Sequence, residues 1–176
     1  RSESMQKNLN LKVKFRESFR PFAPAIIYKD LKDWFDINEK SPYMLFVADI
    51  LKKHQKIFDE KNSKKFMGIE KINLIRSEVP AVTHVDHSSR IQTVHKNLNQ
   101  KFYSLITKFK EMSGIPMIVN TSFNVRGEPI VCSPEDAFKC FMGTDIDILV
   151  IENYYLEKNK QNMQLINNYK DNFELD

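Results

Sequence analysis

Short apolar runs separated by polar segments dominate the pattern of hydrophobic and polar positions along this chain. Four runs predict strands, at residues 23–28, 43–48, 115–119 and 148–151. A further run at 69–75 predicts a weak strand, and the segments 81–85 and 90–94 bracket a polar turn at 86–89. The run at 148–151 is apolar throughout, which is typical of a buried strand.

Two segments carry the signals of long helices. In residues 98–113 apolar side chains recur every three or four positions along one face. Asn97 and Gln100 form a candidate capping pair at its start, and Gly114 is a normal stop. The segment 133–143 begins with a hydroxyl cap, a proline and two acidic residues, which together predict a helix start. A shorter helical turn is expected near Leu31.

The order of these elements predicts an α/β fold. Strands and helices alternate over residues 91–151, and the earlier strands have fewer intervening helices, which favours a mixed sheet. The length of 176 residues suits one domain, which we place at 13–157. Residues 1–12 are expected to be a polar, extended or mobile lead-in, 52–65 a solvent-exposed excursion, and 158–176 a polar tail.

Composition narrows the classes of function. The longest apolar runs have about five or six residues, too few to span a membrane, and no signal peptide is evident. The net charge of +4 is spread over scattered lysines, which disfavours nucleic-acid binding. Cys132 and Cys140 lie about 12 Å apart along a helix, too far for a disulfide, so a cytoplasmic location is expected. Because the chain starts at Arg1, we expect a piece of a longer polypeptide.

A cluster of polar side chains directly follows the apolar run 115–119. Asn120 to Asn124 supply amide and hydroxyl groups where a predicted strand ends, and ligands of open α/β sheets bind outside the carboxyl ends of strands. The alternative is an ordinary polar turn, because Asn, Thr and Ser are common turn formers. By spacing alone the two interpretations are equally supported.

A basic cluster near the start of the chain is the second candidate. If residues 13–16 are extended, Lys14 and Arg16 lie on one face and can bind one anion, and Arg20 follows just before a proline-rich segment. Guanidinium groups bind phosphate or carboxylate through two parallel hydrogen bonds, and lysine adds a point charge. The alternative is a solvated basic strand edge that discourages aggregation.

Arg90, at the start of a predicted strand, is the third candidate. Its alternative role is a surface ion pair with Asp86, which contributes little to stability. His84, His87 and His95 lack the acidic or cysteine partners of a recognisable zinc site. The four glycines form neither a Walker-type nor a dinucleotide-binding loop, so any nucleotide must be bound by side chains and strand ends.

Taken together, these motifs resemble a known family, the O-carbamoyltransferases that include nodulation and antibiotic-tailoring enzymes. The chain is similar to their C-terminal domain over most of residues 12–157, most clearly at 14–24, 41–47, 84–94 and 116–141. The resemblance implies a YrdC-like fold, an open twisted mixed α/β sheet with a concave basic face. It also implies that ATP and carbamoyl phosphate form carbamoyl adenylate with release of pyrophosphate.

The YrdC-like signature pairs a Lys-x-Arg segment with a Ser-x-Asn segment, and this chain has both. The resemblance implies binding of ATP and carbamoyl phosphate by Lys14, Arg16, Arg20, Arg90, Asn120, Thr121, Ser122 and Asn124. Of these, Lys14, Arg20 and Arg90 are the expected catalytic residues, because fixed cations offset the repulsion between anions and stabilise the leaving pyrophosphate. Mg²⁺ is expected to be bound mainly through the phosphates. The turn His87-Ser88-Ser89 departs from the smaller, glycine-led turn of many relatives.

In this family an N-terminal actin/Hsp70-like domain of the same polypeptide, with a bound iron, passes the carbamoyl group to an alcohol. These 176 residues include no segment that resembles it, so we expect substrate binding without complete transfer. Two alternatives stay open. One is threonylcarbamoyl-adenylate formation for tRNA modification on the same fold, and the other is a non-catalytic RNA-binding module.

Overall fold

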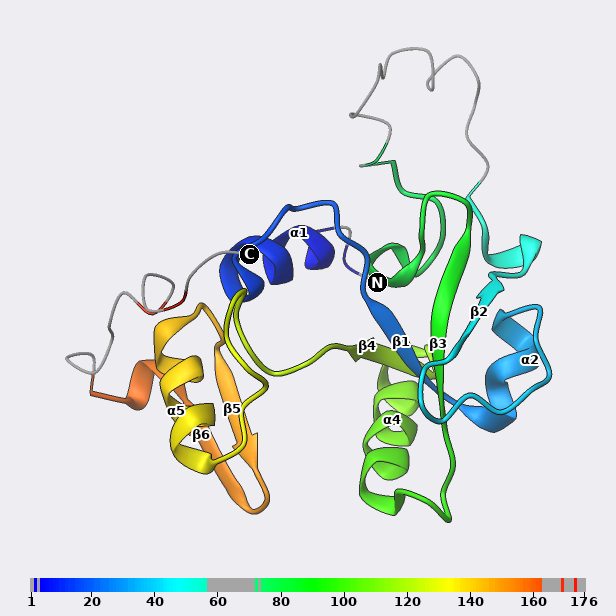
Figure 1. Ribbon diagram of the computed structural model, residues 1–176. Coiled ribbons are helices and arrows are strands. Elements are labelled where there is room, and N and C mark those ends of the chain that lie inside the picture. Colours follow the sequence, from blue (N-terminus) through cyan, green and yellow to red (C-terminus); the bar gives the residue numbers. More distant parts are fainter. Residues whose placement is uncertain are drawn as a thin grey trace. The chain divides into compact units, whose positions relative to one another are not determined.

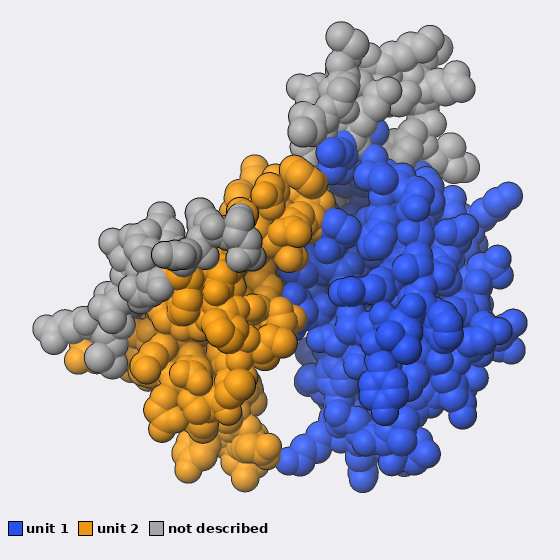
Figure 2. All heavy atoms as spheres, in the orientation of Figure 1, with its two compact units in different colours: residues 1–6, 21–121 blue, residues 7–20, 122–176 orange. Residues whose placement is uncertain are grey.

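Two compact units make up the chain. The computed structural model describes residues 2, 4–56, 72, 74–162, 169 and 173. Unit 1 consists of residues 1–6 and 21–121, and unit 2 of residues 7–20 and 122–176 (Figure 2). Strands and helices occur together in the described residues, which confirms the predicted α/β class. Within these residues no helix has both the length and the apolar character needed to cross a membrane.

Unit 1 is built on a mixed four-stranded sheet with the order β2-β3-β1-β4 (Figure 1). The strands are β1 (Ala23–Ile27), β2 (Phe46–Asp49), β3 (Ser88–Val94) and β4 (Met117–Asn120). β1 runs parallel to β3 and antiparallel to β4, and β2 is antiparallel to β3. All five residues of β1 are buried, as expected for a central strand.

The helix α4 (Gln100–Ser113) packs on this sheet and closes the core of unit 1. Its Ile106 is fully buried with Ala25, Ile27 and Val94. The helix starts two residues later than predicted, because Asn99 rather than Asn97 is the cap and accepts a hydrogen bond from the Phe102 backbone N–H at 3.1 Å. Its predicted stop is confirmed, since Gly114 adopts a left-handed conformation.

Other predictions for unit 1 have mixed outcomes. The helical turn near Leu31 is confirmed as α2 (Leu31–Trp34), which follows the 3-10 helix η2 (Tyr28–Asp30). β2 begins at Phe46 rather than Tyr43, because Met44 has a φ of 59° that is incompatible with a strand.

Residues 81–85 do not form a strand. The 3-10 helix η5 (Pro80–Val82) occupies this segment, and the Thr83 hydroxyl donates to the Val79 carbonyl at 2.9 Å, so local hydrogen bonds replace strand pairing. η3 (Lys52–His54) lies in the lysine-rich excursion, whose remainder from residue 57 falls outside the described residues, as does most of the weak strand predicted at 69–75.

The start of the chain is helical, so the expectation of an extended lead-in is wrong. α1 (Met5–Leu9) continues into η1 (Asn10–Lys14), one turn of π-helix. The π-helix ends at Phe15, whose φ of 49° lies in the left-handed region. Residues 13–16 are therefore not extended, and the alternation assumed for Lys14 and Arg16 does not hold.

In unit 2, α5 (Pro134–Gly143) packs on a two-stranded sheet of β5 (Ile148–Ile151) and β6 (Tyr154–Glu157), followed by η6 (Lys158–Lys160). α5 is capped as predicted by the Ser133 hydroxyl, which accepts from the Asp136 N–H at 3.1 Å. β5 is confirmed as a strand but not as a buried one. Among the described strands it pairs with β6 alone, and of its four residues only Leu149 is buried.

Candidate functional site

A pocket of about 450 Å³ lies within unit 2 and gathers most of the predicted site residues. It is lined by Lys14, Arg16, Arg20, Ser122, Asn124, Val125, Arg126, Gly127, Glu128 and Pro129. Both halves of the expected motif, Lys-x-Arg and Ser-x-Asn, therefore contribute to one cavity.

The register of the sheet explains why segments a hundred residues apart enter unit 2 together. Ala23 at the start of β1 pairs with Asn120 at the end of β4. Because the two strands are antiparallel, the chain enters β1 at the same end of the sheet at which it leaves β4. The residues before β1 and after β4 thus continue from neighbouring points.

Lys14 joins the two segments through its ammonium group. The residue is only 4% exposed. The Nζ donates to the Ser122 carbonyl at 2.5 Å and hydroxyl at 3.1 Å, and to the Asn124 carbonyl at 2.9 Å and side-chain Oδ1 at 2.7 Å. The three N–H groups of the Lys14 ammonium thus have four oxygen acceptors within hydrogen-bonding distance.

This arrangement makes Lys14 an organiser of the pocket wall. Burial, together with the nearby charge of Arg16, lowers the pKa of Lys14 to about 8. A partly desolvated ammonium acts strongly on an anion even without direct contact, because screening by water is reduced. Lys14 therefore holds the loop in place and contributes positive charge near neutral pH.

Asn10 organises the basic segment in the same way. This fully buried residue donates through Nδ2 to the Ser18 carbonyl at 3.1 Å and the Arg20 carbonyl at 2.8 Å. Its Oδ1 accepts from the Arg16 Nε at 2.6 Å, which orients that guanidinium. Sequence reasoning missed Asn10, because a lone asparagine in a polar segment gives no signal of burial.

Glu128 braces the other wall of the pocket. Its Oε2 accepts from the Val125 backbone N–H at 2.8 Å, and its Oε1 accepts from the Tyr169 hydroxyl. Gly127 has a φ of 78°, so a glycine suits the turn between Val125 and Glu128. Burial and the neighbouring Glu128 raise the pKa of the Cys140 thiol to about 12, which makes this cysteine a poor nucleophile.

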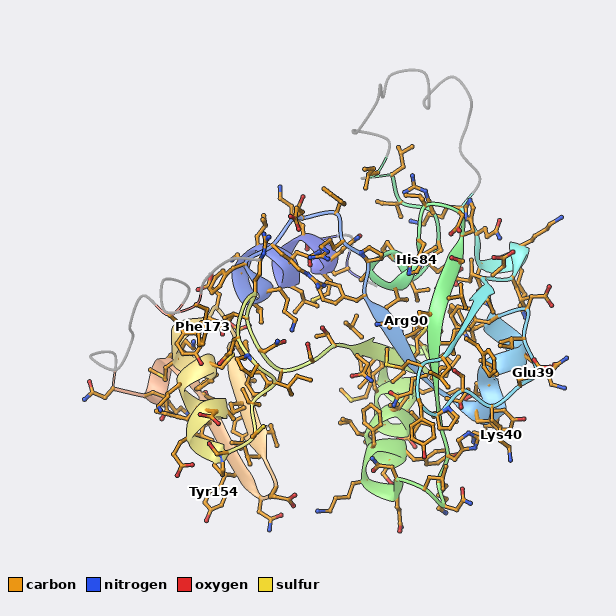
Figure 3. The ribbon with its side chains drawn as sticks, in the orientation of Figure 1. Glu39, Lys40, His84, Arg90, Tyr154 and Phe173 are labelled. Atoms are coloured by element: carbon orange, nitrogen blue, oxygen red, sulfur yellow. The ribbon has the colours of Figure 1, made fainter. Side chains whose placement is uncertain are left out.

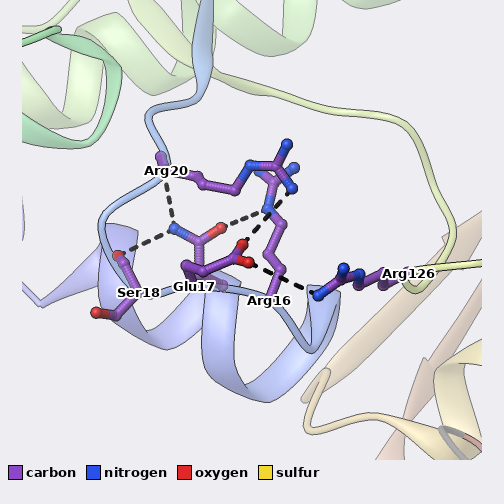
Figure 4. A network of polar contacts seen from close by, with 6 residues as sticks. Arg16, Glu17, Ser18, Arg20 and Arg126 are labelled. Atoms are coloured by element: carbon purple, nitrogen blue, oxygen red, sulfur yellow. Dashed lines mark hydrogen bonds and ion pairs between the residues drawn. The ribbon is translucent and has the colours of Figure 1, made fainter. Parts of the chain in front are cut away.

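Arg126 and Glu17 were also missed by the sequence predictions. Arg126 lines the pocket, and its backbone N–H donates to the Lys14 carbonyl at 3.2 Å. Glu17 forms ion pairs with both Arg20 and Arg126 (Figure 4). The signal for Arg126 was its position two residues after the Ser-x-Asn segment, and for Glu17 its position between two arginines.

Three predicted site residues belong to unit 1. Arg90 is an exposed residue of β3 opposite Val47 (Figure 3). Asn120 donates through Nδ2 to the Gln92 side chain at 2.5 Å, and Thr121 is exposed. Their part in substrate binding stays a prediction.

The surface ion pair considered for Arg90 does not form. Asp86 instead accepts hydrogen bonds from the Ser88 N–H at 3.0 Å and hydroxyl at 2.7 Å. These bonds hold the pKa of the Asp86 carboxyl below its usual value. The turn before β3 is thus fixed by its own side chains, and Arg90 plays no part in it.

Comparisons with known proteins agree on one family. The family model described as "Carbamoyltransferase C-terminus" matches residues 1–158. An uncharacterized protein of Synechocystis sp. is 48% identical over 100% of this chain and 29% of its own length. Nodulation protein NolNO of Sinorhizobium fredii is 35% identical over 85% of the chain and 19% of its length. Nodulation protein NolO of Bradyrhizobium diazoefficiens is 32% identical over 89% and 25%. The chain thus spans less than a third of each of these relatives.

Proposed function

Because the chain belongs to the carbamoyltransferase C-terminus family, we propose that it binds ATP and carbamoyl phosphate and forms carbamoyl adenylate. The observation that carries this proposal is the pocket of unit 2, which is lined by three arginines together with Lys14, Ser122 and Asn124. In this reaction water first cleaves carbamoyl phosphate into carbamate and inorganic phosphate. A carbamate oxygen then bonds to the α-phosphorus of ATP, and the bond to pyrophosphate breaks.

The charge of the pocket supports this chemistry. Two anionic substrates must approach one another, and negative charge builds up on the departing pyrophosphate. Fixed guanidinium groups lower both costs, because they are already oriented before the substrate arrives. Arg16 is oriented by Asn10, and Arg20 lies on the same braced segment. Lys14 adds its charge from within the wall.

Mg²⁺ fits this pocket as an ion carried by the nucleotide. Among the described residues one carboxylate lines the pocket, that of Glu128, and it accepts hydrogen bonds from Val125 and Tyr169. Phosphate oxygens are therefore the main ligands we propose for Mg²⁺, whose role is to neutralise charge on the leaving group. In the described part of the chain no group of three or more His, Cys, Asp or Glu could hold a metal ion. We propose, from the family alone, that iron belongs to the N-terminal domain.

The partner implied by the family is that N-terminal domain of the same polypeptide. We propose that it takes the carbamoyl group from the adenylate and passes it to an alcohol. This chain covers 29% or less of each of the three relatives. That small share supports the proposal that two domains carry out the two steps.

Release of pyrophosphate tests the reaction. We expect the protein to release pyrophosphate from ATP when carbamoyl phosphate is present. Release that needs threonine and bicarbonate instead would identify a threonylcarbamoyl-adenylate synthase. Salt-sensitive RNA binding without nucleotide affinity would identify an RNA-binding module.

Substitution of Arg20 tests the site. We expect Arg20→Ala to weaken ATP or carbamoyl phosphate binding about 10- to 100-fold, the usual value of a hydrogen bond to a charged group. Calorimetry measures the affinity, and circular dichroism checks the fold. Arg90→Ala tests whether that unit 1 residue belongs to the same site. Lys108→Ala, which removes an exposed lysine paired with Glu111, is the matched control. Unchanged affinity in both arginine variants would refute the site.

A further inference from the structure

The acidic side chain of Glu17 lies among the arginines of the pocket. Glu17 places Oε2 3.7 Å from an Arg20 nitrogen and Oε1 3.7 Å from an Arg126 nitrogen (Figure 4). Its two carboxylate oxygens thus face two guanidinium groups from segments a hundred residues apart. A phosphate group presents its oxygens to a pair of arginines in the same manner.

The two ion pairs are loose. A distance of 3.7 Å exceeds the range of an N–H···O hydrogen bond, whereas charge-assisted bonds to carboxylate or phosphate are about 2.7–2.9 Å long. The side chains of Glu17, Arg20 and Arg126 are 46%, 51% and 29% exposed. Such exposed pairs contribute little energy, so a ligand oxygen can replace the carboxylate at small cost.

The backbone of the two arginines is held by contacts that do not involve the Glu17 carboxylate. Arg126 is anchored through its backbone N–H to the Lys14 carbonyl, and the Arg20 carbonyl is held by Asn10. The backbone beneath both guanidinium groups therefore stays in place when the carboxylate moves. Glu17 itself is an exposed residue, so its side chain has solvent to move into.

From this geometry we infer that Glu17 is an internal competitor, whose carboxylate stands between Arg20 and Arg126 where a substrate phosphate group binds. Arg126 is then an anion-binding residue of the same pocket. Ligand binding exchanges two loose ion pairs for shorter hydrogen bonds, and the returning carboxylate favours product release. This inference rests on the proposed function, because it concerns ligands of the same site.

The Glu17→Gln variant tests the inference, because it keeps the size of the side chain and removes its charge. Calorimetry with inorganic pyrophosphate on the intact protein should show about three- to tenfold tighter binding, the effect expected from losing two weak competing ion pairs. Glu111→Gln is the control for net charge, since Glu111 pairs with an exposed lysine of α4 at 2.9 Å. It should leave the affinity unchanged.

A second variant shows whether Arg126 is the point of competition. In an Arg126→Ala background pyrophosphate binds more weakly, and Glu17→Gln should then improve the affinity by a smaller factor than in the wild-type protein. An equal factor in both backgrounds would remove Arg126 from the inference.

Weaker pyrophosphate binding in Glu17→Gln than in the wild-type protein would contradict the inference. If Glu17→Gln weakens pyrophosphate binding while Arg20→Ala also weakens it, Glu17 holds the arginines in position and only the inference fails. If neither the wild-type protein nor Glu17→Gln binds pyrophosphate, ATP or carbamoyl phosphate, the proposed function fails with it. Tighter binding in Glu111→Gln as well would show a general effect of charge, and the inference would again be wrong.

Discussion

Each of the two units is stabilised internally by a different kind of contact. In unit 1 a central strand and a helix bury aliphatic side chains, among them Ile27 and Ile106, which are fully buried. In unit 2 the segments that form the pocket contribute no strand. Lys14 joins them by donating hydrogen bonds to the loop, Asn10 donates within the basic segment, and Glu128 accepts from Val125 within the loop. The apolar part of unit 2 lies around α5 and its hairpin, where Phe141, Met142 and Leu149 are buried together.

The two kinds of contact contribute differently to folding stability and to ligand binding. Apolar burial is insensitive to the direction of a contact, whereas each hydrogen bond of the pocket fixes one side chain in one orientation. The polar contacts contribute less to folding, because hydrogen bonds to water are lost when they form. They determine instead where the guanidinium groups point. The comparison therefore predicts that substitutions in unit 1 act mainly on stability and those in the pocket mainly on binding.

The largest expected effect is on the core of unit 1. Ile27→Ala should lower the free energy of unfolding by about 2–5 kcal/mol, because it removes a side chain with no exposed surface and leaves a cavity. Denaturant unfolding measures this change. Leu98→Ala, at an exposed position before α4, should change it by less than about 0.5 kcal/mol. Equal costs for the two variants would contradict the core described here.

The same contrast explains which predictions succeeded. The helices α4 and α5 and the strand β1 were predicted from apolar spacing and caps, since each buries one continuous set of side chains. β6 was missed because the apolar positions Tyr154, Tyr155 and Leu156 form only a short run just before the Lys- and Asn-rich tail. The start of β3 at Ser88 was missed because its first two residues are small buried serines rather than apolar ones.

Part of the candidate site was also predicted, from motifs rather than from apolar spacing and helix caps. The convergence of Lys14 with Ser122 and Asn124 followed from the motif resemblance, while the extended geometry assumed for residues 13–16 was wrong. The bracing residues Asn10 and Glu128 escaped prediction. Contacts such as that between Glu128 and Tyr169, 41 positions apart, leave no periodic trace in a sequence. A buried polar partner can be identified only when the fold is known.

A smaller effect is expected from pH, and it acts on binding. Burial lowers the pKa of Lys14 to about 8, so the side chain is charged below this pH and loses its charge as the pH rises through it. Pyrophosphate affinity should therefore fall about tenfold between pH 7 and pH 9.5, the value of a charge interaction of roughly 1.4 kcal/mol. Calorimetry across this range measures the change.

The Lys14→Met variant isolates that effect, because pyrophosphate itself changes its charge in this range. Its affinity should be weaker at pH 7 and should lack the part of the decline that centres near pH 8. Lys108→Met, at an exposed position of α4, should follow the wild-type curve. A parallel decline in Lys14→Met and wild type would mean that Lys14 keeps its charge throughout.

The smallest expected effect concerns the far end of the chain. Tyr169 lies beyond residue 158, where the family match ends, yet its hydroxyl donates to Glu128 and its ring packs with Val125 and Cys140. Tyr169→Phe should lower the free energy of unfolding by about 1 kcal/mol, the net value of one hydrogen bond, and weaken pyrophosphate binding by no more than a few fold. Tyr155→Phe, on the exposed face of the hairpin, is the matched control and should change neither quantity. Identical behaviour of the two variants would show that the pocket wall is braced without the tail, whereas a selective loss in Tyr169→Phe would extend the site past the residues that define the family.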